Sequence, residues 1–190
     1  MKVSRFEIIF YLASLLIIMA GCRVVKQKYT AIQERNQHRR DETAPKLTKV
    51  QAYVKRFLPV ALAEQQRYGI PASITLAQGI LESGVGRSKL AADYNNHFGI
   101  KCWCKGKRRD CVQMADDRPT DRFRKYKTAW ESYRDHSRLL QTDTYRHLRG
   151  TDYKRFAKGL KRAGYATKNT YANDLIAVVE RYNLNKFDNY

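Results

Sequence analysis

The feature that most constrains the fold of this chain is an apolar segment that runs from Pro71 to Gly84. Pro71 suits the start of a helix, and Gly84 suits the position that ends one. Between them, Ile74, Ala77 and Leu81 recur at helical spacing, and most of the other residues are apolar or small. A helix that is apolar nearly all round is buried. The segment therefore predicts a central helix around which a domain packs.

The predicted central helix carries one polar stripe. Thr75, Gln78 and Glu82 lie at positions i, i+3 and i+7, which share a face of a helix. Glu82 is at the C-terminal end, where the helix dipole disfavours an anion, and it lies beside apolar residues. Both effects are expected to raise the pKa of the Glu82 carboxyl group toward the range of a general acid. The structural alternative is a helix-end carboxylate that faces water or pairs with Arg87.

Helix signals also precede this segment. Thr48 and Gln51 form a capping-box pattern, which predicts a helix that reaches Phe57. Pro59 suits the first turn of a second helix, and Gly69 suits its end. We therefore expect two consecutive helices before the central one.

Helical patterns resume after residue 127. Thr128 and Glu131 form another capping-box pattern. Four residues of the helix that follows share a face that is expected to be buried: Trp130, Tyr133, Ser137 and Leu140. Thr151 or Asp152 caps a further helix, and a last helix is expected over about 171–182.

The intervening residues, 100–126, have a different character. Lys105-Gly106-Lys107 separates short segments around Cys102–Cys104 and Cys111–Met114, which predicts a small β-hairpin. A further extended piece is expected at Phe123–Tyr126. Helices around one short hairpin make a mostly helical α+β domain.

The N-terminus is typical of a targeting signal. Lys2 and Arg5 precede an apolar run from Ile8 to Ala20, which is short for a membrane span. The small residues before Cys22 resemble the bacterial lipoprotein box, in which a lipid is attached to the cysteine after cleavage before it. The alternative is an uncleaved anchor with an incidental cysteine. The lipoprotein interpretation divides the chain into a signal peptide (1–21), a polar tether (22–46) and a folded domain (47–190).

The chain is strongly basic. It has 37 Lys and Arg against 18 Asp and Glu, a formal net charge of +19. Such a charge ordinarily suggests nucleic acid, but an exported protein meets anionic envelope polymers instead: peptide carboxylates, lipid phosphates and acidic glycans. We therefore expect a partner in the cell envelope and no nucleic acid. The alternative is a basic surface that is simply solvated.

Three cysteines lie in or beside the predicted hairpin. Cys102, Cys104 and Cys111, with His97 nearby, do not have the spacing of a common zinc finger. A hairpin outside the cytoplasm more naturally carries a disulfide, so we expect Cys104–Cys111 or Cys102–Cys111. No metal and no other cofactor is expected.

The same region supplies candidates for a second carboxylate. Cleavage of a glycosidic bond needs an acid to protonate the leaving oxygen, usually with another carboxylate across the sugar. Glu82 suits the first role, and the adjacent pair Asp116 and Asp117 is a candidate for the second. The structural alternative for this pair is an exposed turn, where Asp is common.

Five ordered blocks of sequence resemble one known family. Ile70–Ser88, with its Glu-Ser-Gly, and Asn95–Lys101, with its Phe-Gly-Ile-Lys, are similar to the signature of the bacterial endo-β-N-acetylglucosaminidases of glycoside hydrolase family 73. That family includes autolysins and the hydrolase domain of the flagellar rod-cap protein. The later blocks Phe123–Tyr126, Glu131–Ser137 and Gly164–Ala172 follow in the family's order.

The resemblance implies a lysozyme-like fold, with a groove between a helical lobe and a β-hairpin lobe. It implies that Glu82 is the general acid. Where the family often has Glu in the hairpin lobe, this chain has Asp116 and Asp117. The role of this second carboxylate is left open: it is either a base for a water molecule or a charge that stabilises the oxocarbenium-like sugar. Substrate-binding roles are implied for four further residues: Tyr165, Tyr171, Asn96 and Phe98.

The function expected from the sequence is hydrolysis of the β-1,4 glycan of peptidoglycan after N-acetylglucosamine. Two alternatives share the fold: a muramidase, which cuts the other linkage, and a lytic transglycosylase, which uses one Glu without water. A third alternative is a wall-binding module with an idle acid. The expected location is the cell envelope, with the lipid at Cys22 holding the protein to a bacterial membrane.

Overall fold

The structure is a computed structural model that describes residues 26–28, 30–35, 48–102, 110–114 and 121–189. The chain divides into two compact units, Met1–Lys46 and Leu47–Tyr190. In the first unit, residues 26–28 and 30–35 are helical. Within the described ranges, no helix has both the length and the apolar character needed to cross a membrane. The predicted signal peptide and Cys22 lie outside the described residues.

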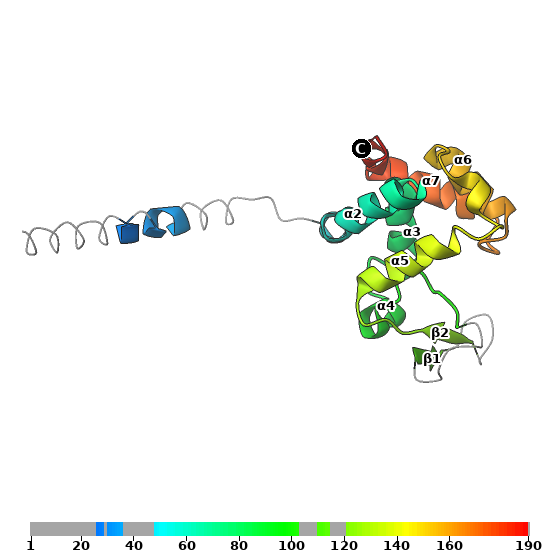
Figure 1. The fold of residues 1–190 in the computed structure, drawn as a ribbon, viewed down its shortest axis with the longest axis horizontal. Coiled ribbons are helices and arrows are strands. Elements are labelled where there is room, and N and C mark those ends of the chain that lie inside the picture. Colours follow the sequence, from blue (N-terminus) through cyan, green and yellow to red (C-terminus); the bar gives the residue numbers. More distant parts are fainter. Residues whose placement is uncertain (1–25, 29, 36–47, 103–109, 115–120, 190) are drawn as a thin grey trace, which may run out of the picture. The chain divides into compact units, whose positions relative to one another are not determined.

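The second unit is built mainly from helices (Figure 1). Its elements are, in chain order, α2 (Lys49–Tyr68), α3 (Ala72–Ser83), α4 (Lys89–Tyr94), β1 (Cys111–Gln113), β2 (Arg122–Arg124), α5 (Ala129–Leu139), η2 (Arg146–Leu148), α6 (Tyr153–Arg162), α7 (Tyr171–Arg181) and η3 (Leu184–Phe187). The expected class, mostly helical α+β, is confirmed.

Helix α3 is the predicted central helix, and its bounds agree with the sequence signals. Pro71 occupies the N-cap, and Gly84 ends the helix in the left-handed conformation at φ 54°. Ten of its 12 residues are buried, and α2, α6, α7 and η3 all pack against it. The core of the domain is therefore assembled around the helix that carries Glu82.

The two helices expected between Thr48 and Gly69 are one continuous helix, α2. The capping box of Thr48 and Gln51 is present, and Gly69 ends the helix at φ 66°. Pro59 lies in the interior, where the missing N–H and the ring crowding cost about 3 kcal/mol. Tertiary packing offsets this cost, because buried residues lie on both sides of the proline: Tyr53, Phe57, Val60, Ala61 and Glu64.

The small sheet differs from the predicted hairpin in its pairing. Strand β1 pairs antiparallel with β2, with Val112 opposite Phe123. Lys101 forms a bridge with Phe123 from the other side, and the Cys102 N–H donates to the Arg122 carbonyl (2.7 Å). Strand β2 is therefore central, and the segment before residue 103 pairs with β2 rather than with β1. The prediction placed this segment against the wrong partner.

A disulfide joins Cys102 to Cys111, with their Cα atoms 6.2 Å apart. This is one of the two pairings left open by the sequence. Cys104 lies outside the described residues. The bond ties the first extended segment to β1 and so holds the edges of the small lobe together.

Helix α5 begins at the predicted cap, since the Thr128 side chain accepts from the Glu131 N–H. Three of the four residues of the predicted buried face, Tyr133, Ser137 and Leu140, are fully buried. His136 is also fully buried, whereas Trp130 is 50% exposed. Trp130 falls at the edge of the buried face in the first turn, so the expectation that it is buried is wrong. For the following helix, α6, Asp152 is the cap.

Candidate active site

The candidate acid, Glu82, lies in the last turn of α3. Its side chain is exposed, unlike most of this helix. The Tyr171 hydroxyl, from the first residue of α7, donates a hydrogen bond of 2.8 Å to Glu82 Oε1. The predicted substrate-binding residue Tyr171 is therefore a direct partner of the predicted acid, across 89 residues of sequence.

Gln78 fixes the direction of that hydrogen bond. It is fully buried one turn before Glu82 on the polar stripe, and its Nε2 donates to the Tyr171 hydroxyl oxygen at 3.0 Å. Because Tyr171 accepts from Gln78, its own proton is directed to Glu82. The stripe seen in the sequence thus becomes a relay in which Gln78 orients Tyr171 and Tyr171 orients the carboxylate.

Tyr165 stacks on Tyr171, with ring centroids 5.7 Å apart and an interplanar angle of 23°. Burial raises the pKa of the Tyr165 hydroxyl well above its usual value, and the nearby Glu82 charge raises it further. Burial, then Tyr165 and Glu82, raise the pKa of Tyr171 in the same direction. Both phenols are therefore neutral hydrogen-bond donors at any physiological pH.

Asn96 and Phe98, the other two predicted substrate-binding residues, are buried. The Asn96 side chain donates to the Ile100 and Arg124 carbonyls (3.0 and 2.9 Å), and its oxygen accepts from the Ile100 N–H (3.1 Å). It therefore ties the loop after α4 to β2. That these two residues shape the groove stays a prediction; the contacts shown are with the protein itself.

His136 is a residue whose place the sequence did not indicate. It is fully buried on α5, where it stacks on Phe98 at a centroid distance of 4.0 Å and meets the Tyr165 ring at 6.2 Å. Burial lowers the pKa of His136 to about 3, so the imidazole is neutral. It thus packs against Tyr165 of the stacked tyrosine pair. In the sequence, only its i+3 spacing from Tyr133 indicates a buried position.

Asp116 and Asp117, the candidates for the second carboxylate, lie outside the described residues. Of the acids that are described in the small lobe, Asp121 is held by Lys101 at 3.0 Å. No group of three His, Cys, Asp or Glu side chains suited to a metal ion occurs in the parts of the chain that the structure describes. The only acid in the described part of this site is Glu82.

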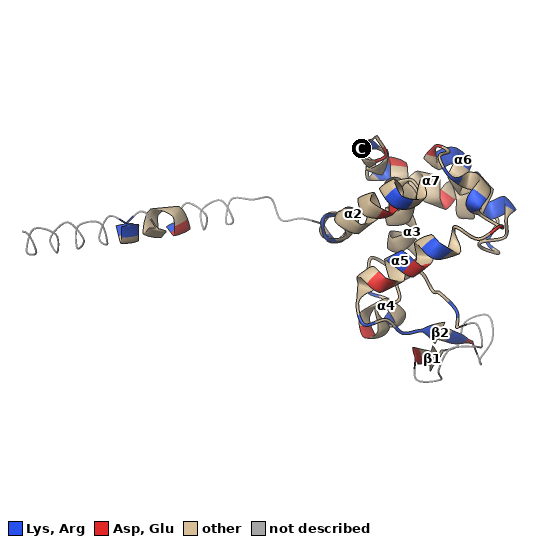
Figure 2. Cartoon of the chain, in the orientation of Figure 1, with Lys and Arg blue, Asp and Glu red and all other residues tan. Residues whose placement is uncertain are grey.

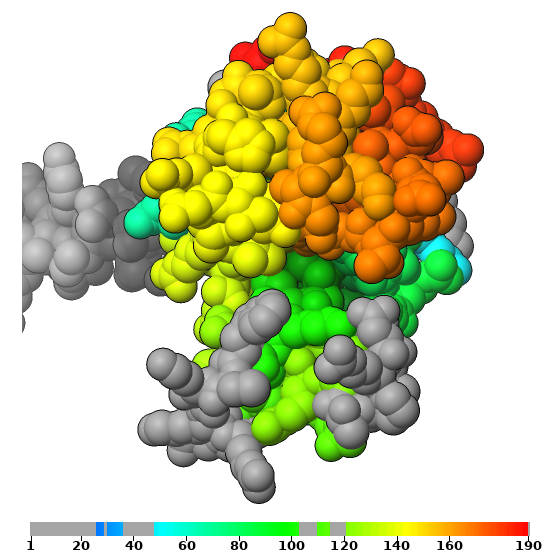
Figure 3. Space-filling view, turned by 90° about the vertical axis from the view of Figure 1, so that its right-hand side faces the viewer, coloured from blue at the N-terminus to red at the C-terminus, as the bar shows by residue number. Residues whose placement is uncertain are grey.

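The surface of the domain is hollowed between its two lobes (Figure 3). Yellow and orange residues of the helical part lie above the hollow, and light-green residues of the small lobe lie below it. The floor has the green of residues near 80–100, the range that contains the end of α3.

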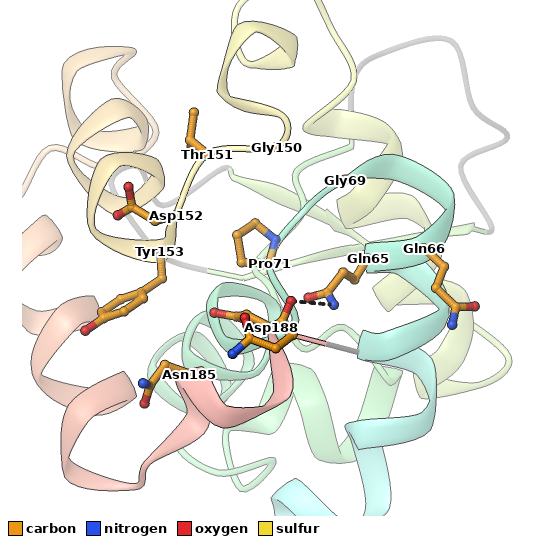
Figure 4. A pocket seen from close by; sticks show the side chains of 11 residues that line it. Gln65, Gln66, Gly69, Pro71, Gly150, Thr151, Asp152, Tyr153, Asn185 and Asp188 are labelled. Carbon is orange, nitrogen blue, oxygen red and sulfur yellow. Dashed lines mark hydrogen bonds between the residues drawn. The ribbon is translucent and has the colours of Figure 1, made fainter.

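A different hollow, of about 570 Å³, lies where α2 ends and α3 begins (Figure 4). Asp188 lines it and is held by the Ser73 N–H and hydroxyl (2.8 and 2.6 Å). This hollow is at the opposite end of α3 from Glu82, so it is not the candidate active site.

The fold is the lysozyme-like fold of peptidoglycan hydrolases. The catalytic domain of the autolysin Auto from Listeria monocytogenes matches with a TM-score of 0.65 at 28% identity, over 82% of this chain and 97% of that one. A peptidoglycan hydrolase from Sphingomonas sp. A1 matches with a TM-score of 0.62 at 31% identity, over 72% and 91%.

The chain belongs to the glucosaminidase family, whose model, described as mannosyl-glycoprotein endo-beta-N-acetylglucosaminidase, matches residues 58–184. It is 41% identical to the exo-glucosaminidase LytG of Bacillus subtilis over 65% of this chain and 48% of the relative. It is 31% identical to the peptidoglycan hydrolase FlgJ of Vibrio parahaemolyticus over 75% and 51%. The chain thus spans about half the length of these relatives.

Proposed function

We propose that residues 47–190 hydrolyse the β-1,4 glycan of peptidoglycan after N-acetylglucosamine, with Glu82 as the general acid. The observation that carries this proposal is the Tyr171–Glu82 hydrogen bond at the exposed end of an otherwise buried helix. A carboxyl group that meets solvent on one side and is oriented by a buried phenol on the other is suited to proton transfer. The family match agrees with this chemistry.

In the proposed mechanism, protonated Glu82 donates its proton to the glycosidic oxygen as the bond to the anomeric carbon breaks. The Tyr171 proton then stabilises the carboxylate that remains, since the Tyr171 hydroxyl already donates to Oε1. The sugar develops an oxocarbenium-like charge, and water attacks the anomeric carbon. We assign the second acidic role to Asp116 or Asp117, and Tyr165 offers an aromatic edge beside the cleaved bond.

The linkage and the mode of attack are tested by mass spectrometry of digested peptidoglycan. Reducing N-acetylglucosamine ends are expected. Reducing N-acetylmuramic acid ends, or anhydro ends, would replace the proposal by the muramidase or the transglycosylase. The relative LytG is named an exo-enzyme, so the size of early products is measured too: long fragments indicate internal cuts, and released terminal units indicate an exo mode. No product at all would leave a binding module, and equal product from Glu82→Gln would show that Glu82 is not the general acid.

We also propose that the protein acts in the cell envelope, held to a bacterial membrane by a lipid on Cys22 at the end of a short tether. The sequence around Cys22 supports this, and peptidoglycan as substrate agrees with it. Fractionation of cells that express Cys22→Ser tests the anchor. Loss from the membrane fraction and a changed processing pattern are expected, and an unchanged distribution would contradict the lipid.

A further inference from the structure

A second pocket, of about 470 Å³, lies on the other side of the end of α3. It is enclosed by the first half of α2, the loop after α3, helix α4 and the start of α5. Much of its wall is formed by small or apolar side chains: Ala52, Phe57, Val85, Ala91, Ala92 and Ala129. Such a volume is in the range of sites for small ligands.

The charges that line this pocket are all positive. Lys49, Arg56 and Arg87 line it, and no Asp or Glu does. None of these three cations forms an ion pair with any described residue: Arg87 Nε donates to the Gly84 carbonyl (3.3 Å), and the Arg56 guanidinium lies 5.2 Å from the Phe57 ring centroid. Lys154, by contrast, is paired with Glu180 (2.9 Å). Figure 2 shows Lys and Arg at the start of α2.

The pocket also contains a buried hydrogen-bond donor, His97, which is 6% exposed. Tyr133 donates to the Tyr53 hydroxyl (2.8 Å), and the Tyr53 hydroxyl lies 2.9 Å from His97 Nδ1. Because the Tyr53 hydroxyl accepts from Tyr133, its own proton is directed to His97 Nδ1. With Nδ1 as the acceptor, the neutral imidazole carries its proton on Nε2. That nitrogen has no partner among the described residues.

Burial, and then the Arg56 charge, lower the pKa of His97 to about 4. His97 is therefore neutral near pH 7 and offers Nε2–H as a donor rather than a positive charge. The pocket thus combines one neutral buried donor with three exposed cations.

This pocket is separate from the candidate active site, although both adjoin the end of α3. Ser83 faces the pocket side, where its hydroxyl contacts the Tyr53 hydroxyl at 3.4 Å. Its neighbour Glu82 faces Tyr171. Adjacent residues of one helix thus belong to two different sites, so a ligand in the pocket would leave the Glu82 carboxylate open.

We propose that this pocket binds the carboxylate end of a short peptide with small apolar side chains. Arginine side chains match carboxylates in a two-pronged geometry, and walls of alanine suit methyl-sized side chains by area and shape. That the natural source is the peptide stem of peptidoglycan rests on the proposed function. The pocket would then hold a stem peptide while the glycan lies at Glu82.

The test is a titration of the full chain with N-acetyl-alanyl-alanine. Binding is measured by calorimetry and by the change in the imidazole NMR signals of His97. We expect saturable binding and a shift of the His97 signals. The carboxamide of the same dipeptide is expected to bind at least about tenfold more weakly, because it lacks the charge that Arg56 and Arg87 would meet. Each of Arg56→Gln and Arg87→Gln is expected to lower the affinity for the acid about tenfold.

Lys55→Gln is the matched control, since Lys55 is an exposed cation of α2 beside Arg56 that does not line the pocket. It is expected to change the affinity less than twofold. Equal losses in Lys55→Gln and Arg56→Gln would overturn the proposal in favour of a general charge effect. So would equal binding of acid and carboxamide, unchanged His97 signals, or inorganic phosphate binding as tightly as the peptide.

Glu82→Gln separates this proposal from the proposed function. It is expected to bind the dipeptide like the unmodified chain while glycan cleavage is lost. If Glu82→Gln still cleaves glycan while the dipeptide is bound as expected, the assignment of Glu82 as the acid fails and the peptide pocket stands. If Glu82→Gln is inactive but no chain binds the dipeptide, the pocket proposal fails and the catalytic proposal stands.

Discussion

Two groups of tyrosines flank the second half of α3, and each leads by hydrogen bonds to a different kind of residue. On one side, Gln78 and Tyr171 lead to Glu82, which is exposed. On the other side, Tyr133 and Tyr53 lead to a buried histidine. The same chemical unit, a buried phenol that donates onward, thus positions a solvent-facing acid in one direction and a buried imidazole in the other.

The difference shows which side of the helix can support chemistry. At Gly79, on the side of Tyr53 and Tyr133, the packing leaves no room for a side chain, since a Cβ would lie 2.6 Å from the Tyr53 hydroxyl oxygen and 2.7 Å from that of Tyr133. On the open side, the relay reaches solvent within one helical turn. Tight packing on one side fixes the axis of α3, and that fixed axis holds Glu82 in place for the other side.

The largest expected effect separates two adjacent residues, Glu82 and Ser83. Glu82→Gln should lower kcat by about 10²–10⁴-fold, because it removes the transferable proton, and should change the free energy of unfolding by less than about 0.5 kcal/mol. Ser83→Ala should preserve kcat and destabilise the fold by about 1–2 kcal/mol, since Ser83 bonds to the Gly79 carbonyl and the Gly86 N–H. Steady-state rates and urea unfolding measure both. Similar losses of kcat in the two variants would remove the distinction between the sides.

The second effect concerns His136, whose stack on Phe98 joins the two groups of rings. Its folded pKa of about 3 lies below the usual 6.5. The stability it contributes is therefore full above pH 6.5 and is lost as the pH falls toward 3, by roughly 3 kcal/mol between pH 7 and pH 4. His136→Phe should flatten the unfolding free energy over that interval relative to the unmodified chain. Parallel curves for the two proteins would contradict this account.

The third effect concerns the side of Tyr53 and Tyr133 alone. Gly79→Ala should destabilise the domain by about 2 kcal/mol, because the new methyl group overlaps two phenol oxygens. At an unconstrained helical position the same change would stabilise it by up to about 1 kcal/mol. Adding Tyr133→Phe should recover part of the loss by removing one of those oxygens. Urea unfolding of the single and double variants measures this, and a simple sum of the two losses would argue against the clash.

The smallest effect compares one phenol from each side. Tyr171→Phe should lower kcat about tenfold with little change in KM, because the carboxylate left by Glu82 loses one hydrogen bond. Tyr133→Phe should leave kcat unchanged and cost about 1 kcal/mol of stability. An equal fall of kcat in both variants would show that the relay does not matter to the reaction.

The parts of this fold that depend on local chemistry could be predicted from the sequence. Pro71 and Gly84 bound α3 as expected, and the stripe of Gln78 and Glu82 is present. Pro59 misled because distant packing outweighs a local cost. The sheet was paired wrongly because strands of three residues carry too little alternation to choose between partners.

Within the candidate site, the acid was visible in the sequence and its environment was not. Tyr171 was indicated only by a family resemblance, since no periodicity links it to a residue 89 positions away. His136 was missed because a buried imidazole with no polar partner among the described residues leaves no pattern beyond its helical spacing. Long-range contacts of this kind arise from packing, which a single sequence does not state.

The bond between Asp188 and Ser73 has a consequence for how the chain matures. The first turn of α3 receives its carboxylate partner from a residue 115 positions later. During synthesis, this contact therefore forms only after nearly the whole domain has emerged, whereas the bond from the Ala72 N–H to Gln65 Oε1 (2.6 Å) is local. The two ends of the folded domain are thus joined by one carboxylate, so a truncation that removes Asp188 would leave the Ser73 N–H and hydroxyl without this partner.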